Sequence, residues 1–216
     1  MRLAAWMPFA RAAAELGWFC GAAVGADTAR RLAEAAGAAL VAHETAEAER
    51  LAAERPAPPD GPRVQQLSAD GAMVPLVGGE WAEAKTVALG AVGAARDPGG
   101  APVVRTTAVS RFSRLADAEA FGRLALVETH RRGVETAGTV VAVTDGSEWL
   151  QGFVDQHRPD AVRVLDFPHA VQHLNAAAQA AFGEASPAAV AWLDQQAAEL
   201  RDGDPDRVLA ALRALP

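Results

Sequence analysis

The sequence is poor in cysteine, with Cys20 as the only one in 216 residues. A single cysteine provides no disulfide framework within the chain and excludes a zinc site built from cysteines. No run of about 18 or more apolar residues is free of charge, so we expect neither a membrane span nor a secretory signal segment. These absences predict a cytoplasmic protein. The length of 216 residues predicts one domain, or one domain with an appendage.

An excess of positive charge is also missing. The chain has 20 Lys and Arg residues against 27 Asp and Glu, which gives a net charge of −7. A negative total repels polyanions and counts against nucleic-acid binding by the chain as a whole. Arginines nevertheless gather locally, as at Arg30 and Arg31, and a short basic stripe can attract phosphate within a Debye length. No Gly-rich phosphate loop follows a strand, which disfavours a small-molecule enzyme on a nucleotide-binding sheet.

Residues 1–55 predict a helical appendage. A short helix is expected from Phe9 to Leu16, with a break at Gly17, and a longer helix is expected to begin at Asp27. Arg30 and Arg31 lead this second helix. The arrangement fits a DNA-binding helix-turn-helix whose recognition helix begins with basic residues, although a plain helical hairpin is the commoner outcome of such a pattern.

A proline-rich segment at residues 56–63 ends the helical region and predicts a linker, because proline cannot continue a helix. The pattern then changes to that of a domain with strands and helices over residues 64–183. Strands are expected at residues 64–76, 86–92, 103–112, 139–144 and 162–165, and helices at 115–132 and 147–157. This order predicts an α/β fold with a ribonuclease-H-like mixed sheet, in which three antiparallel strands precede two parallel ones. The first strand should then lie beside the fourth.

Two Asp-Gly steps each close an apolar segment, at Asp70–Gly71 and Asp145–Gly146. If the first and fourth strands are neighbours, the two carboxylates lie side by side on a rigid scaffold and can seat a divalent cation. Asp-Gly is also common in tight turns, because both residues tolerate the backbone angles that turns require. Spacing alone leaves both interpretations open.

Three further stretches of sequence strengthen the first interpretation when they are taken together: residues 67–76 with 80–85, residues 143–149, and residues 165–174. In combination they resemble bacterial insertion-sequence transposases of the ISKra type, which are related to the Mutator-like and ISLre groups. The similarity extends in order over about residues 5–215. It implies a DDE transposase, in which two aspartates and a glutamate of a ribonuclease-H-like domain hold two Mg²⁺ or Mn²⁺ ions.

The resemblance assigns roles to individual residues. Asp70 matches the first metal-binding aspartate of the family and Asp145 the second. Asp166 and His169 match a D-x-x-H motif, which implies a place near the metal centre without direct binding of the ion. His169 can alternatively be a buried or capping histidine. His169 and His173 lie four residues apart and could form half of a zinc site, but the sequence offers no third ligand.

The family's third acid is a glutamate that follows a helical insertion. Residues 184–216 resemble the start of that insertion, and the expected glutamate has no counterpart in this sequence. Glu184 falls at a spacing typical of compact integrase-like domains, but it follows Gly183 outside the helix. We therefore expect a truncated and impaired transposase acting in the bacterial cytoplasm at the nucleoid. Its implied partners are transposon and target DNA and further copies of the chain; the alternative is a non-catalytic remnant that binds DNA or oligomerises.

Overall fold

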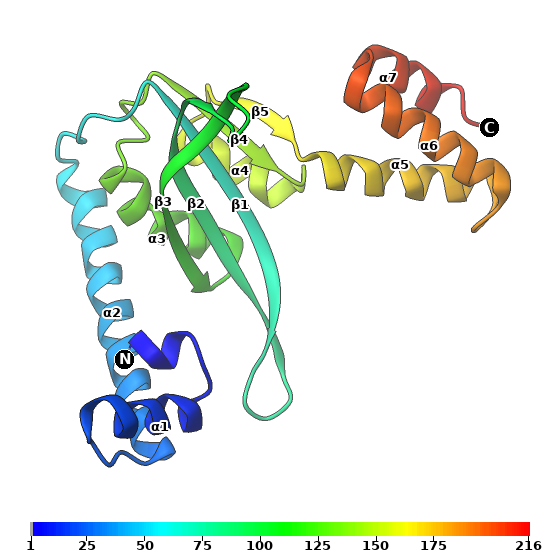
Figure 1. The fold of residues 1–216 in the computed structure, drawn as a ribbon. Coiled ribbons are helices and arrows are strands. Elements are labelled where there is room, and N and C mark those ends of the chain that lie inside the picture. The colour runs from blue at the N-terminus through cyan, green and yellow to red at the C-terminus, as the bar shows by residue number, and fades with distance from the viewer. Residues whose placement is uncertain (1) are drawn as a thin grey trace.

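The computed structural model describes residues 2–216, which form an α/β fold with one open, five-stranded mixed sheet and seven α-helices (Figure 1). The elements are a 3₁₀ helix η1 (Arg2–Ala5), α1 (Phe9–Cys20), α2 (Ala26–Glu54), β1 (Val64–Pro75), β2 (Trp81–Arg96), β3 (Pro102–Leu115), α3 (Ala118–Arg131), β4 (Thr139–Thr144), α4 (Glu148–His157), β5 (Val162–Leu165), α5 (Phe167–Phe182), α6 (Pro187–Asp202) and α7 (Pro205–Arg213).

The sheet has the strand order β3-β2-β1-β4-β5. β1 to β3 pair antiparallel, and β4 and β5 are added in parallel on the other side of β1. This confirms the predicted three antiparallel and two parallel strands, and the predicted contact between the first strand and the fourth. The antiparallel hairpins need only short turns, whereas each parallel strand follows a helix that carries the chain back across the sheet.

The hydrophobic core lies on one face of the sheet, beneath α3 and α4. Alternate residues of the strands point into it, for example Leu67, Val87 and Phe112, because successive side chains of a strand face opposite sides. Phe121 of α3 and Phe153 of α4 fill the space above them. On the opposite face the strand side chains are half-buried or exposed, so the sheet is covered on one side only.

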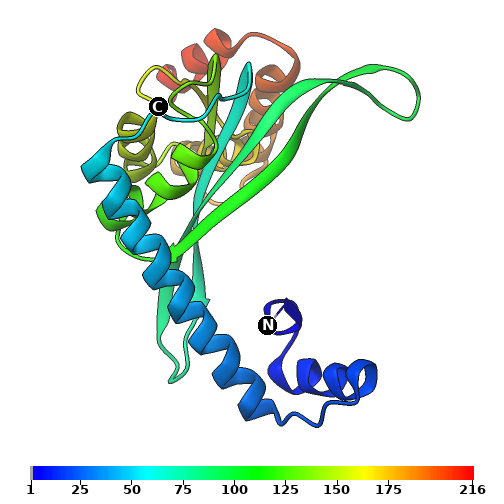
Figure 2. The ribbon, with the colours of Figure 1, turned by 90° about the vertical axis from the view of Figure 1, so that its left-hand side faces the viewer.

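The N-terminal helices form an arm along the domain. The second half of α2 packs against α3, and α1 folds back against the first half of α2 (Figure 2). The predicted break at Gly17 is wrong, since α1 continues through Gly17 and ends at Gly21, which has a φ of 64°. Glycine inside a helix costs only about 1 kcal/mol, whereas the left-handed conformation at Gly21 directs the chain out of the helix.

A second helical arm leaves the sheet after β5. α5 projects away from the sheet edge, α6 runs back along α5, and α7 packs on α6 (Figure 1). Leu174 and Ala178 of α5 are buried in this arm, and Phe182 contacts Trp192. No helix within residues 2–216 has the length and apolar character needed to cross a bilayer.

The proline-rich segment is fixed to the loop between α3 and β4 rather than free. The Thr136 hydroxyl donates to the Pro59 carbonyl oxygen at 2.6 Å and accepts from the Gly61 N–H at 2.8 Å. A Cβ added at Gly61 would overlap backbone atoms of Gly133 and Ala137. The backbones touch here, and this contact sets where β1 begins.

We expect Gly61→Ala to lower the free energy of unfolding by about 2 kcal/mol, because the added methyl group meets backbone that cannot rotate away. Gly37→Ala is the matched control. No atom of residues 2–216 outside α2's own backbone lies within 4 Å of a Cβ at Gly37 in the exposed middle of α2, so that change should stabilise the protein by about 0.5–1 kcal/mol. Urea unfolding of both variants checks the contrast, and equal effects would contradict it.

Candidate functional site

The register of the parallel strands brings three aspartates into line. Ser68 of β1 pairs with Val143 of β4, and Val143 pairs with Val164 of β5. An aspartate stands two residues after each of Ser68, Val143 and Val164. Asp70 lies within β1, and Asp145 and Asp166 directly follow the last residues of β4 and β5. Because residues two apart in a strand share a face, all three positions belong to the sheet face that no core covers.

These aspartates line a pocket of about 330 Å³ at one edge of the open face. The pocket is formed by Gln66, Ser68, Ala69, Asp70, Val143, Thr144, Asp145, Asp166 and His169. The structure therefore brings together Asp70, Asp145, Asp166 and His169, the candidate residues that come from three separate segments of the sequence.

Asp70 lies within a continuous strand. β1 extends to Pro75, so the turn interpretation is wrong for Asp70–Gly71. A Cβ at Gly71 would meet only the flexible end of the Glu83 side chain on β2, and Gly71 does not have a positive φ. The exposed Asp70 carboxylate accepts a hydrogen bond from the Gly71 N–H at 2.7 Å.

Asp145 follows the last residue of β4, so this Asp-Gly step forms a turn and also contributes a carboxylate to the pocket. Gly146 has a φ of 86°, a conformation that favours glycine, and the Asp145 carboxylate accepts a hydrogen bond from the Ser147 N–H at 2.7 Å. Partial burial acts to raise the pKa of Asp145, but the bond from Ser147 and the nearby His169 and His173 lower it further than burial raises it. Asp145 is therefore an ionised carboxylate at the mouth of the pocket.

Asp166 and His169 contact each other across the first turn of α5. The His169 Nδ1 atom lies 3.2 Å from Asp166 Oδ2. Asp166 occupies the N-cap position of the helix, so the pair ties the end of β5 to the start of α5. The structure therefore places the His169 ring against the Asp166 carboxylate. Zinc binding with His173 gains no support, since residues 2–216 contain no group of three or more His, Cys, Asp or Glu that could hold a metal ion.

Neither the Asp70 nor the Asp145 carboxylate forms an ion pair within residues 2–216. Hard carboxylate oxygens suit Mg²⁺ and Mn²⁺. Mg²⁺ is commonly bound through one or two carboxylates, with waters and substrate phosphates as the remaining ligands. The donor set of this pocket fits an ion shared with a phosphate group.

Glu184 does not belong to this pocket. It follows Phe182, the last residue of α5, whereas Asp166 precedes the first. A helix of 16 residues spans about 24 Å at about 1.5 Å per residue, so α5 holds Glu184 far from Asp145. Counting residues between acids could not reveal this, because the count does not show that the intervening chain is a straight helix leading outwards.

Arg30 and Arg31 are paired with neighbouring carboxylates. Arg30 contacts Asp27 at 2.7 Å and Glu34 at 2.9 Å, and Arg31 contacts Asp27 at 3.1 Å. These contacts raise the pKa of Arg30 through its hydrogen bonds with Asp27 and Glu34. The first turns of α2 carry balanced charge, and the proposed DNA contact at this position would require the arginines to exchange these partners for phosphate.

Sequence reasoning missed four residues on the same sheet face. Gln66 and Ser68 alternate with buried residues ahead of Asp70, a period-two signal that the sequence does contain. Thr106 and Arg111 of β3 carry no comparable signal, because the register between β2 and β3 shifts at Leu89.

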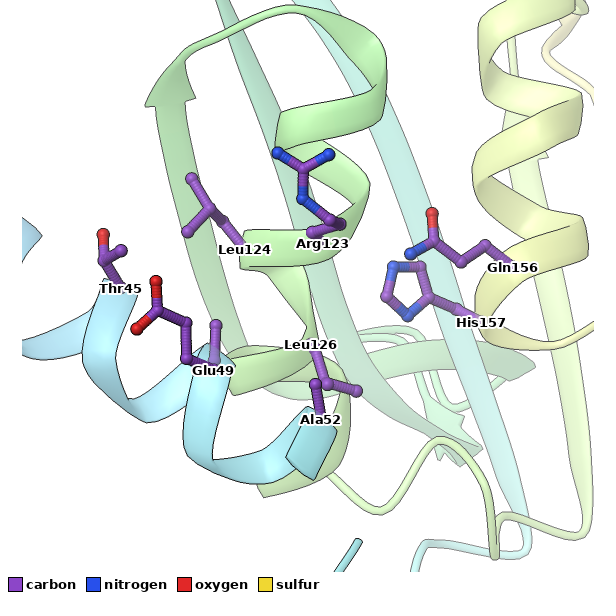
Figure 3. Close-up of a pocket in the computed structure, with 9 residues that line it drawn as sticks. Thr45, Glu49, Ala52, Arg123, Leu124, Leu126, Gln156 and His157 are labelled. Atoms are coloured by element: carbon purple, nitrogen blue, oxygen red, sulfur yellow. The ribbon is translucent and has the colours of Figure 1, made fainter. Parts of the chain in front are cut away.

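A larger pocket of about 420 Å³ lies between α2, α3 and α4, away from the aspartates (Figure 3). Glu49 of α2, Arg123 of α3 and His157 of α4 contribute to its walls. Both ring nitrogens of His157 are engaged, by Thr129 at 3.1 Å and by the Gly122 carbonyl oxygen at 3.0 Å. Neither ring nitrogen of His157 is therefore free for a group in this pocket.

Comparison with known proteins found neither a family model nor a curated protein that matches this chain.

Proposed function

We propose that this chain is a DNA-processing protein of the DDE transposase kind, with a ribonuclease-H-like sheet and a divalent-metal site at Asp70 and Asp145. The observation that carries the proposal is the alignment of Asp70, Asp145 and Asp166 on three parallel neighbouring strands around one pocket. Ends of adjacent parallel strands commonly supply the polar groups of active sites in α/β proteins.

In this proposal Asp70 and Asp145 hold Mg²⁺ or Mn²⁺ between them, and Asp166 with His169 fixes the end of β5 beside the ion. The bound ions would activate a water or a 3′-hydroxyl group and stabilise the leaving oxygen of a DNA phosphodiester. Two carboxylates hold a cation less firmly than three, and no group of three is assembled within residues 2–216. We therefore expect the chain to bind the metal weakly and to bind DNA without cleaving it.

The test is a titration with Mn²⁺, in which free Mn²⁺ is followed by electron paramagnetic resonance. Wild-type protein should bind with a dissociation constant of about 1 mM or weaker. Asp70→Asn combined with Asp145→Asn should remove this binding, because the amides lack the negative charge that attracts the ion. Asp97→Asn, in the turn between β2 and β3, loses one carboxylate charge elsewhere and should bind like wild type.

Mn²⁺ binding that persists in the double variant would contradict the proposal, because it would place the metal elsewhere in the chain. Metal-dependent DNA cleavage that disappears in Asp70→Ala would support the metal site and contradict only the expectation that the chain does not cleave DNA.

A second candidate function is self-association through the N-terminal helices, as a non-catalytic oligomerising protein. Trp6, Trp18 and Phe19 expose 83%, 78% and 69% of their surface, and large aromatics this exposed are typical of interaction sites. If these side chains join copies of the chain, Trp18→Ser with Phe19→Ser should shift the protein to monomer in sedimentation velocity. An unchanged sedimentation coefficient would exclude these two residues from the interface.

A further inference from the structure

The open face of the sheet carries an arginine in line with the aspartate pocket. Ser68 of β1 pairs with Ala88 of β2, and Ala88 pairs with Arg111 of β3. All three side chains therefore share the face on which Asp70 lies. Arg111 stands two strands from Ser68, a distance of about 10 Å at about 4.8 Å per strand, and only the methyl group of Ala88 lies between them.

Arg111 is exposed and forms no ion pair or side-chain hydrogen bond with any of residues 2–216. Arg114, three residues further along β3, differs because it is paired with Glu44 of α2. The guanidinium of Arg111 thus presents its positive charge and its donors to whatever approaches the open face.

A chain of hydrogen bonds on the same face leads to Ser68. The Thr106 hydroxyl donates to Gln66 Oε1 at 2.6 Å, and Gln66 Nε2 donates to Ser68 Oγ at 3.1 Å. With the amide in this orientation, the first bond has an O–H donor and the second an N–H donor, and both lengths are in the normal range. Ser68 Oγ is an acceptor in this chain, and its own hydrogen finds no acceptor among residues 2–216. That hydrogen is free for a group in the pocket.

A β-bulge builds this chain of bonds. The register shift sets both Ala108 and Val109 opposite Gly90, and Ala108 takes a φ of 49°. A Cβ at Gly90 would overlap the Thr106 side chain, so the glycine leaves room for Thr106 to reach Gln66. The positive φ of Ala108 and the absence of a side chain at Gly90 together allow the Thr106 hydroxyl to reach Gln66 beside the pocket.

We propose that Ser68 and Arg111 bind phosphate groups of a DNA backbone that crosses the open face towards Asp70 and Asp145. The proposal takes its substrate class from the proposed function. Aspartates alone repel a phosphate, and an exposed arginine with a free hydroxyl hydrogen supplies the charge and the donor that offset this repulsion. The backbone is contacted without reading bases, so binding should depend little on sequence.

The test is fluorescence anisotropy of a short labelled DNA duplex in EDTA, which removes any metal contribution. Arg111→Ala should weaken binding about five- to tenfold at about 0.1 M salt, and should reduce the slope of log K against log salt by about 0.9. Arg105→Ala is the matched control. Arg105 is exposed on the same strand and also lacks an ion pair within residues 2–216, but by the register it pairs with Gly93 and faces the other side.

The hydroxyl contact is tested in the same assay. Ser68→Ala should weaken binding about threefold, while Ser68→Thr, which keeps a hydroxyl, should bind like wild type. Ser113→Ala should have no effect, because the Ser113 hydroxyl is already bonded to Thr86 at 2.8 Å. Equal effects of Arg111→Ala and Arg105→Ala, or no DNA binding by wild-type protein, would overturn the inference.

The outcome is separable from that of the proposed function. The anisotropy assay contains no metal and the Mn²⁺ titration contains no DNA. Suppose that Arg111→Ala loses DNA binding while the Asp70 and Asp145 double variant still binds Mn²⁺. This result would support the phosphate contacts and reject the metal site.

Discussion

Replacing Phe121 by alanine should lower the free energy of unfolding by about 3–5 kcal/mol, the largest loss of stability expected for a single core residue in this chain. Phe121 is fully buried where α3 meets the sheet and α4. Its ring stacks on Phe153 at 5.4 Å and meets the edge of Trp149 at 6.1 Å. The substitution removes these contacts and leaves a cavity that three separate elements cannot close.

Urea unfolding followed by circular dichroism measures this effect. Phe19→Ala is the matched control, because the same atoms are removed from a ring that is 69% exposed on α1. The control should change stability by no more than about 0.5 kcal/mol. A loss below about 1.5 kcal/mol for Phe121→Ala would mean that Phe121 does not hold the core as described.

The strand order was predictable because the sequence alternates wherever a strand has one buried face. Leu67 and Ala69 point into the core while Ser68 and Asp70 point out, and this period of two identifies β1 directly. The two parallel strands were also recognisable, since each follows a helix with an apolar face. A strand that returns after a crossover helix commonly adds in parallel to a neighbouring strand, which leaves few topologies to consider.

The acids of the site were predictable for a related reason. Asp70 lies within an apolar strand and Asp145 directly follows one, so the pairing of β1 with β4 brings the two aspartates to the same part of the sheet. The direction of α5 was not predictable, because the helical pattern of residues 167–182 is the same whether the helix packs on the sheet or leaves it. Glu184 was considered as a ligand only because that direction was unknown.

Local sequence also gave no sign of the bulge at Ala108. Alanine rarely adopts a positive φ, and its conformation here is imposed by pairing on both sides of the bulge rather than by its own preference. Thr106 and Arg111 consequently could not be assigned to a face from the sequence. One extra residue in a strand reverses the face of every residue beyond it.

Acid should destabilise this protein through His157, by about 3 kcal/mol between neutral pH and pH 4. Burial lowers the pKa of His157 to about 4, and this outweighs the hydrogen bond to the Gly122 carbonyl oxygen, which raises it. The unfolded chain has an ordinary histidine pKa of about 6.5, so between these values the unfolded state binds more protons than the folded state. Stability is therefore full above about pH 6.5, falls as the pH drops through this window, and levels off below about pH 4.

Urea unfolding at pH 7, 5 and 4 measures this dependence, and His157→Gln should flatten it. Glutamine can still donate to the Gly122 carbonyl oxygen but binds no proton, so the variant should lose about 3 kcal/mol less than wild type over the same range. It should also be less stable than wild type at pH 7, because the imidazole packs against Phe153 at 4.5 Å. His43→Gln, on the exposed side of α2, removes a histidine without disturbing a buried contact and should keep the wild-type acid response. An acid response as steep in His157→Gln as in wild type would show that His157 is not its source. Asp145 and Asp160 have lowered pKa values, so their contribution is expected at more acidic pH.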